Sequence, residues 1–341
     1  MGRERVRAPS SGPRTIGTST LVGSADNPRQ RGTTNRRMDS TVSPVGESFE
    51  PITVVIPVYS GVEPGHLRRA LGSMQEQTLP ADEILIVEDG PLGAGLDAVV
   101  AELGGVDSRV RRISLAQNRG VAYAMQAGIE AAKNRWVARM DADDVSLPNR
   151  LEMQAQAASG GHYAAIGAAM LEFEGDEENI VGLRVMPLTE ERIRRYVLTN
   201  SPINNPTLFL DRDAALAVGG VRHVPNMEDY DLFARLAAGG YPMLNLAEPL
   251  LLFRADPAMF KRRSARGMFA AEVQMQRNLR SYGLIRTPRM YANLLVRSAF
   301  RALPQRALRF AYALLFRVRP PGSKGLGSRA SGKGTAKSDG L

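Results

Sequence analysis

The sequence predicts an α/β protein in which a mostly parallel β-sheet is covered by helices on both faces. Two runs, ITVVIPVY at 52–59 and EILIVED at 83–89, are apolar and rich in β-branched residues, which is typical of buried strands. Further elements are expected as strands at 110–115 and 136–143 and as helices at 66–77, 96–103 and 121–133. Strands that alternate with helices of this length form βαβ units, so neighbouring strands should be parallel.

Each expected element follows from a local pattern of apolar residues. The first helical segment places four apolar side chains on one face, which can then cover the sheet: Leu67, Ala70, Leu71 and Met74. A turn at Ser60 and Gly61 separates this segment from the first strand. The fourth strand, WVARMDAD, changes from apolar to acidic residues at its end, where a ligand site is expected.

Composition excludes several classes of protein. The chain has 341 residues, 43% of them hydrophobic, no cysteine and three histidines without a zinc-binding spacing. Disulfides, thiolate metal sites and a cysteine nucleophile are therefore excluded. There is no uninterrupted apolar run of about 18 residues and no apolar segment typical of a secretory signal, so a cytoplasmic protein is expected.

Composition also predicts the organisation of the chain. Residues 1–49 are rich in Arg, Ser, Thr, Gly and Pro and are expected to be disordered, with Met38 as an alternative start. We expect one α/β domain over 50–262, a helical region over 263–319 and a disordered Gly/Ser/Lys-rich tail over 320–341.

The basic residues are concentrated at the C-terminal end. The net charge is +9, but residues 254–341 contain 19 basic and 3 acidic residues. Within this stretch, 303–317 has an amphipathic pattern with apolar residues opposite arginines, which predicts a helix on an anionic membrane surface. The alternative is a helix that packs on the body of the protein. No nucleic-acid-binding motif accompanies the charge, so no nucleic acid partner is expected.

Polar residues and glycines follow each of the four expected strands. They are Tyr59, the segment Glu88-Asp89-Gly90, the segment Asn118-Arg119-Gly120, and the segment 141–144, which reads DADD. Ligands of open α/β sheets bind beyond the carboxyl ends of strands, so these residues are candidates for one site. For any one segment, ordinary turn chemistry is the alternative explanation.

The DADD segment indicates a metal site. Carboxylates at positions i and i+2 point to one side of an extended chain, as Asp141 and Asp143 would. Together with phosphate oxygens and water they can hold a hard cation such as Mg2+ or Mn2+. The alternative is a solvated acidic turn that caps the helix expected near Pro148.

Several segments together resemble family-2 glycosyltransferases. ITVVIPVYSG, SMQEQTLPADEILIVEDGP, NRGVAYAMQAGIEAA and MDADDVSLPNRLEMQ are similar to the half that binds the nucleotide-sugar. NNPTLFLDRDAALAVGGV and NMEDYDLFARLAAGG are similar to the acceptor half, so the resemblance covers about 51–262. It implies a GT-A fold, a single Rossmann-like α/β domain, here followed by a basic helical tail. The EDGPL segment is most similar to bacterial exopolysaccharide enzymes of amylovoran type.

The resemblance implies a role for each candidate residue at the nucleotide-sugar. Pro57 and Tyr59 would border the nucleobase, and Asp89 would hydrogen-bond it. Three consecutive residues would line the ribose and diphosphate, namely Asn118, Arg119 and Gly120. Asp141 would contact ribose or sugar, and Asp143 would ligate Mn2+ or Mg2+.

The resemblance also implies inverting transfer with Asp229 as general base. In-line attack by an acceptor hydroxyl needs one carboxylate base and no protein nucleophile, which agrees with the absence of cysteine and of a GxSxG elbow. Asp229 and Glu228 stand where a helical pattern begins, so the alternative is that both acids only cap this helix.

The sequence departs from the family after the acceptor half. Asp256 stands where histidine is common, so either Asp256 serves the metal or no late ligand exists. Arg254, Lys261 and Arg262 are candidates to neutralise the diphosphate, or else they are surface charges that face a membrane.

The expected function is transfer of a sugar to a glycan or lipid-linked glycan, at the inner face of the cell membrane. One alternative is a sugar nucleotidyltransferase, which usually has a Gly-rich signature near the first strand that VYSGVEPGHLRRA lacks. The other is a non-catalytic, membrane-docked module that binds nucleotide-sugars.

Overall fold

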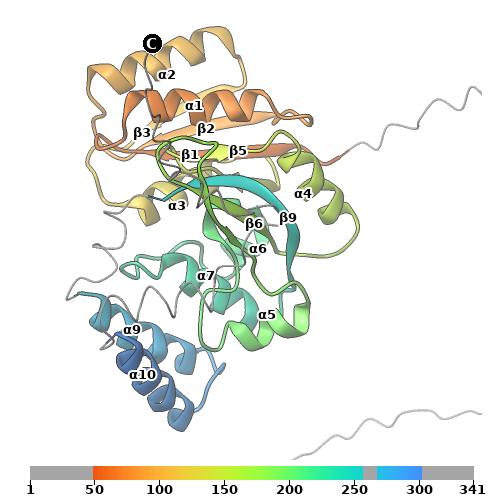
Figure 1. Ribbon diagram of the computed structural model, residues 1–341, viewed down its shortest axis with the longest axis vertical. Helices are drawn as coiled ribbons and strands as arrows, with labels where there is room; N and C mark the ends of the chain where they lie inside the picture. The colour runs from red at the N-terminus through yellow and green to blue at the C-terminus, as the bar shows by residue number, and fades with distance from the viewer. Residues whose placement is uncertain (1–48, 256–266, 302–341) are drawn as a thin grey trace, which may run out of the picture. The chain divides into compact units, whose positions relative to one another are not determined.

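A computed structural model describes residues 49–255 and 267–301, and within them one mixed sheet runs between two layers of helices (Figure 1). Four strands form the parallel half, in the order β3-β2-β1-β4. Their bounds are Ile52–Val58 for β1, Glu83–Glu88 for β2, Val110–Ser114 for β3 and Trp136–Arg139 for β4. The predicted α/β class and mostly parallel sheet are confirmed.

The sheet continues beyond β4 with strands that the sequence pattern did not predict. Its order there is β8-β6-β9-β5, with β7 paired to β6. The bounds are Phe209–Asp211 for β8, Ala165–Phe173 for β6, Met243–Arg254 for β9, Val145–Ser146 for β5 and Ile180–Arg184 for β7. Only β6 and β9 are parallel here; β8 is antiparallel to both β4 and β6.

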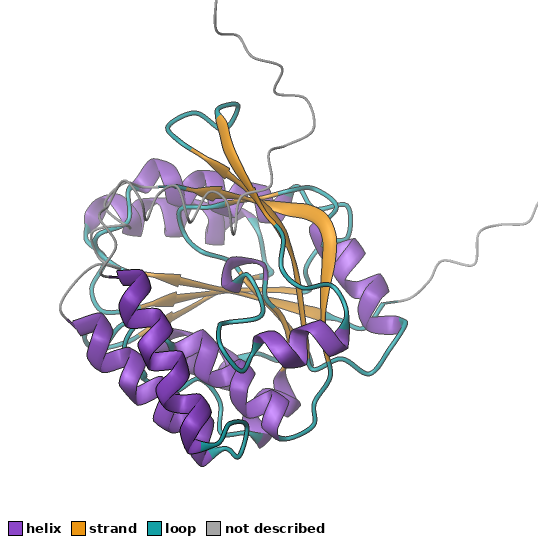
Figure 2. Cartoon of the chain, turned by 60° about the horizontal axis from the view of Figure 1, so that its bottom comes forward, coloured by secondary structure: helices purple, strands orange, loops and turns teal. Residues whose placement is uncertain are grey.

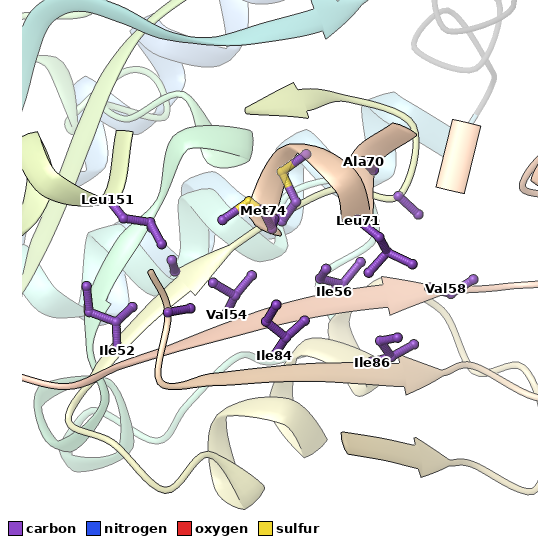
Figure 3. Close-up of a cluster of buried hydrophobic side chains, with 14 of the residues drawn as sticks. Ile52, Val54, Ile56, Val58, Ala70, Leu71, Met74, Ile84, Ile86 and Leu151 are labelled. Atoms are coloured by element: carbon purple, nitrogen blue, oxygen red, sulfur yellow. The ribbon is translucent and has the colours of Figure 1, made fainter. Parts of the chain in front are cut away.

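Three helices cover one face of the sheet and complete the first core cluster. They are α1 (Pro64–Gln75), α2 (Ala94–Val106) and α4 (Arg150–Ser159). Figure 3 shows how α1 meets the strands, with the side chains of Leu71 and Met74 directed toward those of Val54 and Ile56 on β1. The apolar face predicted for this helix is therefore its buried face.

Other helices cover the opposite face and form a second cluster. They are α3 (Val121–Ala131), α5 (Glu190–Tyr196), α6 (Arg212–Ala217) and α7 (Glu228–Ala238), and a short 3-10 turn at Asn205–Thr207 precedes β8. Gly128 of α3 allows a close approach to β1, because a Cβ at this position would clash with the side chain of Val55.

Two further helices, α9 (Gly267–Ser281) and α10 (Thr287–Arg301), lie side by side (Figure 2), and α9 packs on α7. They share a third core cluster with it, which includes Tyr230, Ala234, Met275 and Leu279. No helix among the described residues is long and apolar enough to cross a membrane. The helix expected over 303–317 lies outside the described residues.

The strand expected over 136–143 is shorter in the structure. It ends at Arg139, and residues 142–144 form a turn, so the acids of DADD do not alternate along an extended chain. The turn brings the N–H of Asp144 to within 3.4 Å of the Asp141 carbonyl oxygen. At the end of the strand, the Arg139 carbonyl oxygen accepts from the buried guanidinium of Arg150 at 2.6 Å, so a side chain satisfies this backbone group.

Candidate active site

The carboxyl ends of β1 and β2 meet at one edge of the sheet. Val58 is paired in register with Glu88, and the N–H of Asp89 donates to the Val58 carbonyl oxygen at 2.7 Å. Tyr59 therefore lies beside the turn that contains Asp89. The structure brings these two predicted residues to one place, as expected for parallel strands.

Asp89 clamps the loop that precedes α3. Its carboxylate is buried and accepts the backbone N–H groups of Arg119 and Gly120 at 2.7 and 2.8 Å. Gly90 has φ +82°, and a Cβ there would lie 2.6 Å from the nitrogen of Asn118. The loop is thus held against β2 at a distance that only glycine permits. The contact of Asp89 with a nucleobase stays a prediction.

Glu88 stabilises the same strand end through the neighbouring strand. Its carboxylate oxygens accept from the Arg112 guanidinium at 2.5 Å and from the Ser114 hydroxyl at 2.6 Å. These two bonds tie the end of β2 to β3.

An aromatic ring and a guanidinium are exposed at this edge. Tyr59 is 44% exposed, and Gly61 leaves room for its ring, since a Cβ at Gly61 would clash with it. Arg119 lies over the ring of Tyr123 at 3.9 Å, and Tyr123 stacks on His223 with ring centroids 5.7 Å apart. An exposed ring can stack on a nucleobase, and an exposed guanidinium can bind a phosphate.

The turn after β4 holds a cluster of three carboxylates. Asp141 is paired with the Arg139 guanidinium at 2.7 Å. Burial, followed by repulsion from Asp141, raises the pKa of Asp143. Asp144 is almost fully buried, and burial, Asp141 and Asp143 together raise its pKa well above the usual range. Burial and mutual repulsion therefore favour the protonated forms of Asp143 and Asp144 more than water would.

Two arginines hold this turn in place. Arg150 is fully buried, donates to the Arg139 carbonyl and to Gln154 Oε1, and has its pKa lowered to about 10 by burial. Arg254 donates its backbone N–H to Asp144 Oδ1 at 2.9 Å and its Nε to the Asp143 carbonyl at 3.0 Å. The Arg254 guanidinium also lies over the Phe173 ring at 4.6 Å.

Arg254 is the one late candidate that the structure describes, and it lies beside the acidic turn. Its guanidinium nitrogens bind backbone carbonyls, so it fixes the shape of the turn whatever it contributes to a diphosphate. Asp256, Lys261 and Arg262 lie outside the described residues.

The donor set fits a divalent cation that is completed by a substrate. Among the described residues, no group of three or more His, Cys, Asp and Glu side chains is arranged to hold a metal ion. Mg2+ and similar ions are often held by one or two carboxylates together with substrate phosphates. Asp144 Oδ2 is buried without a hydrogen-bond partner, and an orphaned carboxylate oxygen of this kind fits a turn that binds a cation.

Asp229 lies on a different element, in the first turn of α7. This helix begins at Glu228, as the sequence predicts, and its N-cap is Met227, which provides no side-chain cap. Asp229 Oδ2 accepts a hydrogen bond from the Ser201 hydroxyl at 3.0 Å. Burial raises the pKa of neighbouring Glu228, and Asp229 contributes to the same direction more weakly.

Asp231, two residues further along α7, has structural contacts. It is fully buried and accepts from Arg235 at 2.8 Å, Asn278 at 2.9 Å and Tyr282 at 2.7 Å. These bonds tie α7 to α9 and its following turn, which leaves Asp229 and Glu228 as the acids available for chemistry on this helix.

Sequence reasoning missed three side chains at the candidate site: two contact predicted residues, and the third, Arg150, donates to the carbonyl oxygen of Arg139 beside them. They are Ser201, Arg150 and the pair partner of Asp141, Arg139. Arg139 and Arg150 flank DADD in the sequence. Three neighbouring carboxylates need positive charge nearby, and this need could have identified both arginines. Ser201 is 28 residues from Asp229, and no local pattern connects them.

A mixed sheet of this order, with an acidic turn after its fourth strand, agrees with the GT-A fold expected from the sequence. Residues 53–219 match the family described as "Glycosyl transferase family 2". The chain is 33% identical, over 264 residues, to the amylovoran biosynthesis glycosyltransferase AmsE of Erwinia amylovora, and the match covers 76% of this chain and 97% of that protein. The chain therefore belongs to glycosyltransferase family 2, and the predicted family is confirmed.

Two other similarities extend this comparison. The UDP-Gal:alpha-D-GlcNAc-diphosphoundecaprenol beta-1,3-galactosyltransferase of Escherichia coli is 24% identical over 78% of this chain and 96% of that protein. The mannosyltransferase PcManGT from Pyrobaculum calidifontis, in complex with GDP-Man and Mn2+, has a TM-score of 0.50 and 17% identity, covering 81% of this chain and 83% of that one. The second similarity shows a shared fold.

Proposed function

We propose that this glycosyltransferase moves a sugar from a nucleotide-sugar to a growing surface polysaccharide, with inversion at the anomeric carbon. The observation that carries the proposal is the pair of separate acidic features: a buried carboxylate cluster at the edge of the sheet and Asp229 on α7. The names of the relatives, which include an amylovoran enzyme and a galactosyltransferase, support a polysaccharide product.

The nucleotide would lie along the carboxyl ends of β1 and β2. Tyr59 would stack on the nucleobase beside Pro57, and Asp89 would contact its edge. The loop 118–120 would line the ribose and diphosphate, because Asp89 fixes its backbone. Asp141 would contact the ribose or the sugar from its place beside Arg139.

Asp143 would hold Mn2+ or Mg2+, with Asp256 as a further candidate ligand from outside the described residues. When bound, the cation supplies neutralisation of the diphosphate as it leaves. Asp144 supports this role, since its carboxylate binds the backbone N–H of Arg254 and fixes the turn that presents Asp143. Arg254, Lys261 and Arg262 are proposed contacts of the diphosphate.

Asp229 would act as the general base for the acceptor. As the acceptor oxygen bonds to the anomeric carbon, the bond from that carbon to the diphosphate breaks, and the hydroxyl proton passes to Asp229. The hydrogen bond from Ser201 engages Oδ2, so the other carboxylate oxygen, Oδ1, can take the proton. The nucleoside diphosphate leaves with the electron pair.

The acceptor would be a glycan or lipid-linked glycan at the inner face of the cell membrane. The name of the E. coli relative includes a diphosphoundecaprenol acceptor, which supports a lipid-linked substrate here. The excess of basic residues after position 254 supports an anionic membrane surface as partner.

The test compares wild type with Asp143→Asn on a panel of UDP-, GDP- and dTDP-sugars, with and without Mn2+. We expect one nucleotide class to raise the melting temperature in the presence of Mn2+ and to release nucleoside diphosphate slowly. Asp143→Asn should lose both effects while it remains folded. Stabilisation without turnover on any acceptor would favour a non-catalytic module, and formation of nucleotide-sugar from a nucleoside triphosphate would favour a nucleotidyltransferase.

A further inference from the structure

The outer face of α10 carries an apolar stripe that is open to solvent in the described structure. Tyr291, Leu295 and Val296 are 63%, 73% and 67% exposed. Their spacing places them on one side of the helix, together with exposed Pro288 and Ala292. Three large apolar side chains that are exposed together on one helix indicate an interaction surface.

The opposite side of α10 packs against the rest of the protein. Met290 belongs to the third core cluster, and Asn293 donates to the Leu198 carbonyl oxygen at 2.9 Å. Arg297 pairs with buried Glu272 at 2.5 Å and also donates to the Thr199 carbonyl oxygen. The stripe is therefore additional to the packing of this helix, and the inner contacts fix the direction in which it faces.

The exposed charge of the helical pair α9 and α10 has one sign. Between residues 257 and 301 the sequence contains a single acidic residue, Glu272, which is buried and paired. Four arginines of this helical pair are exposed: Arg277, Arg280, Arg286 and Arg289. The described surface of α9 and α10 thus presents cations and apolar groups without an exposed carboxylate of its own.

We propose that the outer face of α10 docks on an anionic lipid bilayer. A helix with apolar and aromatic residues on one side and arginines around them lies in the plane of the lipid headgroups. Arginine side chains can reach lipid phosphates while their stems lie along the apolar region. The proposal rests on the membrane location in the proposed function and assigns it to a surface distinct from the 303–317 segment.

Charge argues against the two main protein alternatives. A second copy docked through the same face would bring two sets of arginines together, and like charges oppose each other across an interface. An acidic protein partner would need an apolar patch that matches the stripe as well as carboxylates that match the arginines. An anionic bilayer satisfies both groups at once, since its headgroups are charged and its interior is apolar.

The docked face also lies on the helical pair that supports the proposed base. Asp231 of α7 accepts from Asn278 of α9 and from Tyr282 just beyond it, and Asp229 lies one half-turn earlier on α7. A bilayer that holds α10 would therefore hold the acceptor side of the enzyme near lipid-linked substrates.

The experiment measures binding of the full chain to vesicles of phosphatidylcholine, with and without phosphatidylglycerol, by sedimentation. We expect binding to the anionic vesicles, and an affinity at least about tenfold lower for Leu295→Ser combined with Val296→Ser. The matched control is Val106→Ser, at a similarly exposed apolar residue on α2, which should bind as wild type. Both sites are exposed, so melting temperatures should not change.

A second pair of variants tests the arginines. Arg280→Gln with Arg286→Gln should weaken binding about tenfold or more, whereas Arg192→Gln with Arg194→Gln on α5 removes the same charge and should have little effect. Wild-type binding by the Leu295 and Val296 variant would overturn the proposal. A second result would also overturn the proposal: wild type does not bind vesicles but forms a concentration-dependent dimer, and the Leu295 and Val296 variant does not form that dimer.

These measurements need no sugar transfer, so they separate this proposal from the reaction. Turnover on a water-soluble acceptor should be the same in wild type and in the Leu295 and Val296 variant. If the chain binds vesicles but has no transferase activity, the docking proposal is supported and the proposed reaction is refuted.

Discussion

Asp229 hydrogen-bonds the hydroxyl of Ser201 and stands at the second position of α7. Asp213 occupies the same position in α6 but is exposed and pairs with Arg212. The two acids therefore share a local backbone setting and differ in surroundings. A comparison between them can separate an effect on chemistry from an effect on the helix.

We expect Asp229→Asn to lower turnover by at least about a hundredfold, because the proposed carboxylate base is lost. Asn is nearly isosteric and can still accept from Ser201, so melting temperature and nucleotide-sugar affinity should stay near those of wild type. Initial rates, calorimetry and donor titration measure the three quantities, with Asp213→Asn as the matched control. Retention of more than about a tenth of the activity would move the role to Glu228 or Asp256.

Ser201→Ala tests whether the hydroxyl orients this carboxylate. Loss of the bond should lower kcat by about tenfold and leave KM for the donor unchanged, since Ser201 contacts the proposed base and no predicted donor residue. Ser201→Thr keeps a hydroxyl and should restore most of the rate. Equal rates for the Ala and Thr variants would show that the bond has no part in turnover.

At this scale local patterns in the sequence mark the acids as candidates but do not identify their partners. DADD and Asp229 are recognisable because they follow a strand or begin a helix, which are local features. The contact of Arg254 with Asp143 spans 111 residues, and that of Ser201 with Asp229 spans 28. Such contacts depend on how distant elements pack, which local periodicity does not encode.

Among the elements, β1, β2 and β3 are joined to the end of α3 by one buried carboxylate, Glu83. It accepts from Thr53 Oγ1 at 2.8 Å, from the Lys133 N–H at 3.0 Å and from the Arg111 guanidinium at 2.9 Å. Burial raises the pKa of Glu83, but these bonds outweigh burial and the pKa is lowered overall. The folded state therefore favours the ionised form.

Glu83→Gln should lower the free energy of unfolding by about 1–3 kcal/mol at pH 7, because charged hydrogen bonds become neutral or are lost. Since the folded pKa lies below the ordinary value of 4.5, this contribution is present above that value and is lost as pH falls through the folded pKa. Urea unfolding measures this at neutral and acid pH. The difference in the free energy of unfolding between wild type and variant should be smaller at acid pH.

The control for Glu83 is Glu102→Gln on α2. Glu102 pairs with Arg68 at 2.8 Å, but both side chains are more than half exposed, so the change should be near zero. A Glu83 variant with the same stability as the Glu102 variant would show that the buried network contributes nothing.

Elements of the parallel half were predictable, and those of the other half were not. β1 and β2 are short apolar runs buried on both faces, which is a local signal. β8 has three residues and is defined by its pairing with β4 and β6. β9 pairs with β6 through two shifts of register around Ala169. The alternation of inward and outward side chains along the pair is therefore interrupted.

At the scale of the whole molecule, α9 and α10 stabilise α7 through a shared hydrophobic core cluster. Tyr230 and Ala234 of α7 share a core cluster with residues of α9 such as Met275. The hydroxyl of Tyr230 donates to the Val197 carbonyl oxygen at 2.8 Å, and burial raises its pKa. Helix α10 also holds the segment before Ser201, through the bonds that Asn293 and Arg297 donate to its backbone.

A chain that ends after residue 266 should therefore be strongly destabilised. It would expose Tyr230 and Ala234 to water and leave Asp231 without Asn278 and Tyr282. Each buried Leu or Met that leaves the core contributes about 1.5–3 kcal/mol, and about 1 kcal/mol corresponds to about 2–4 °C in melting temperature for a protein of this size. We expect a fall of at least about 10 °C, or aggregation, measured by calorimetry and light scattering.

Two other truncations and one substitution make this result specific. Chains that start at Met38 or end after residue 301 keep every described contact of the third cluster and should melt as wild type does. If the chain ending after residue 266 cannot be purified, Met275→Ala tests the same cluster, because its side chain is fully buried and its truncation should cost about 2–5 kcal/mol. Wild-type melting of that variant would mean that α9 contributes little to the stability of α7.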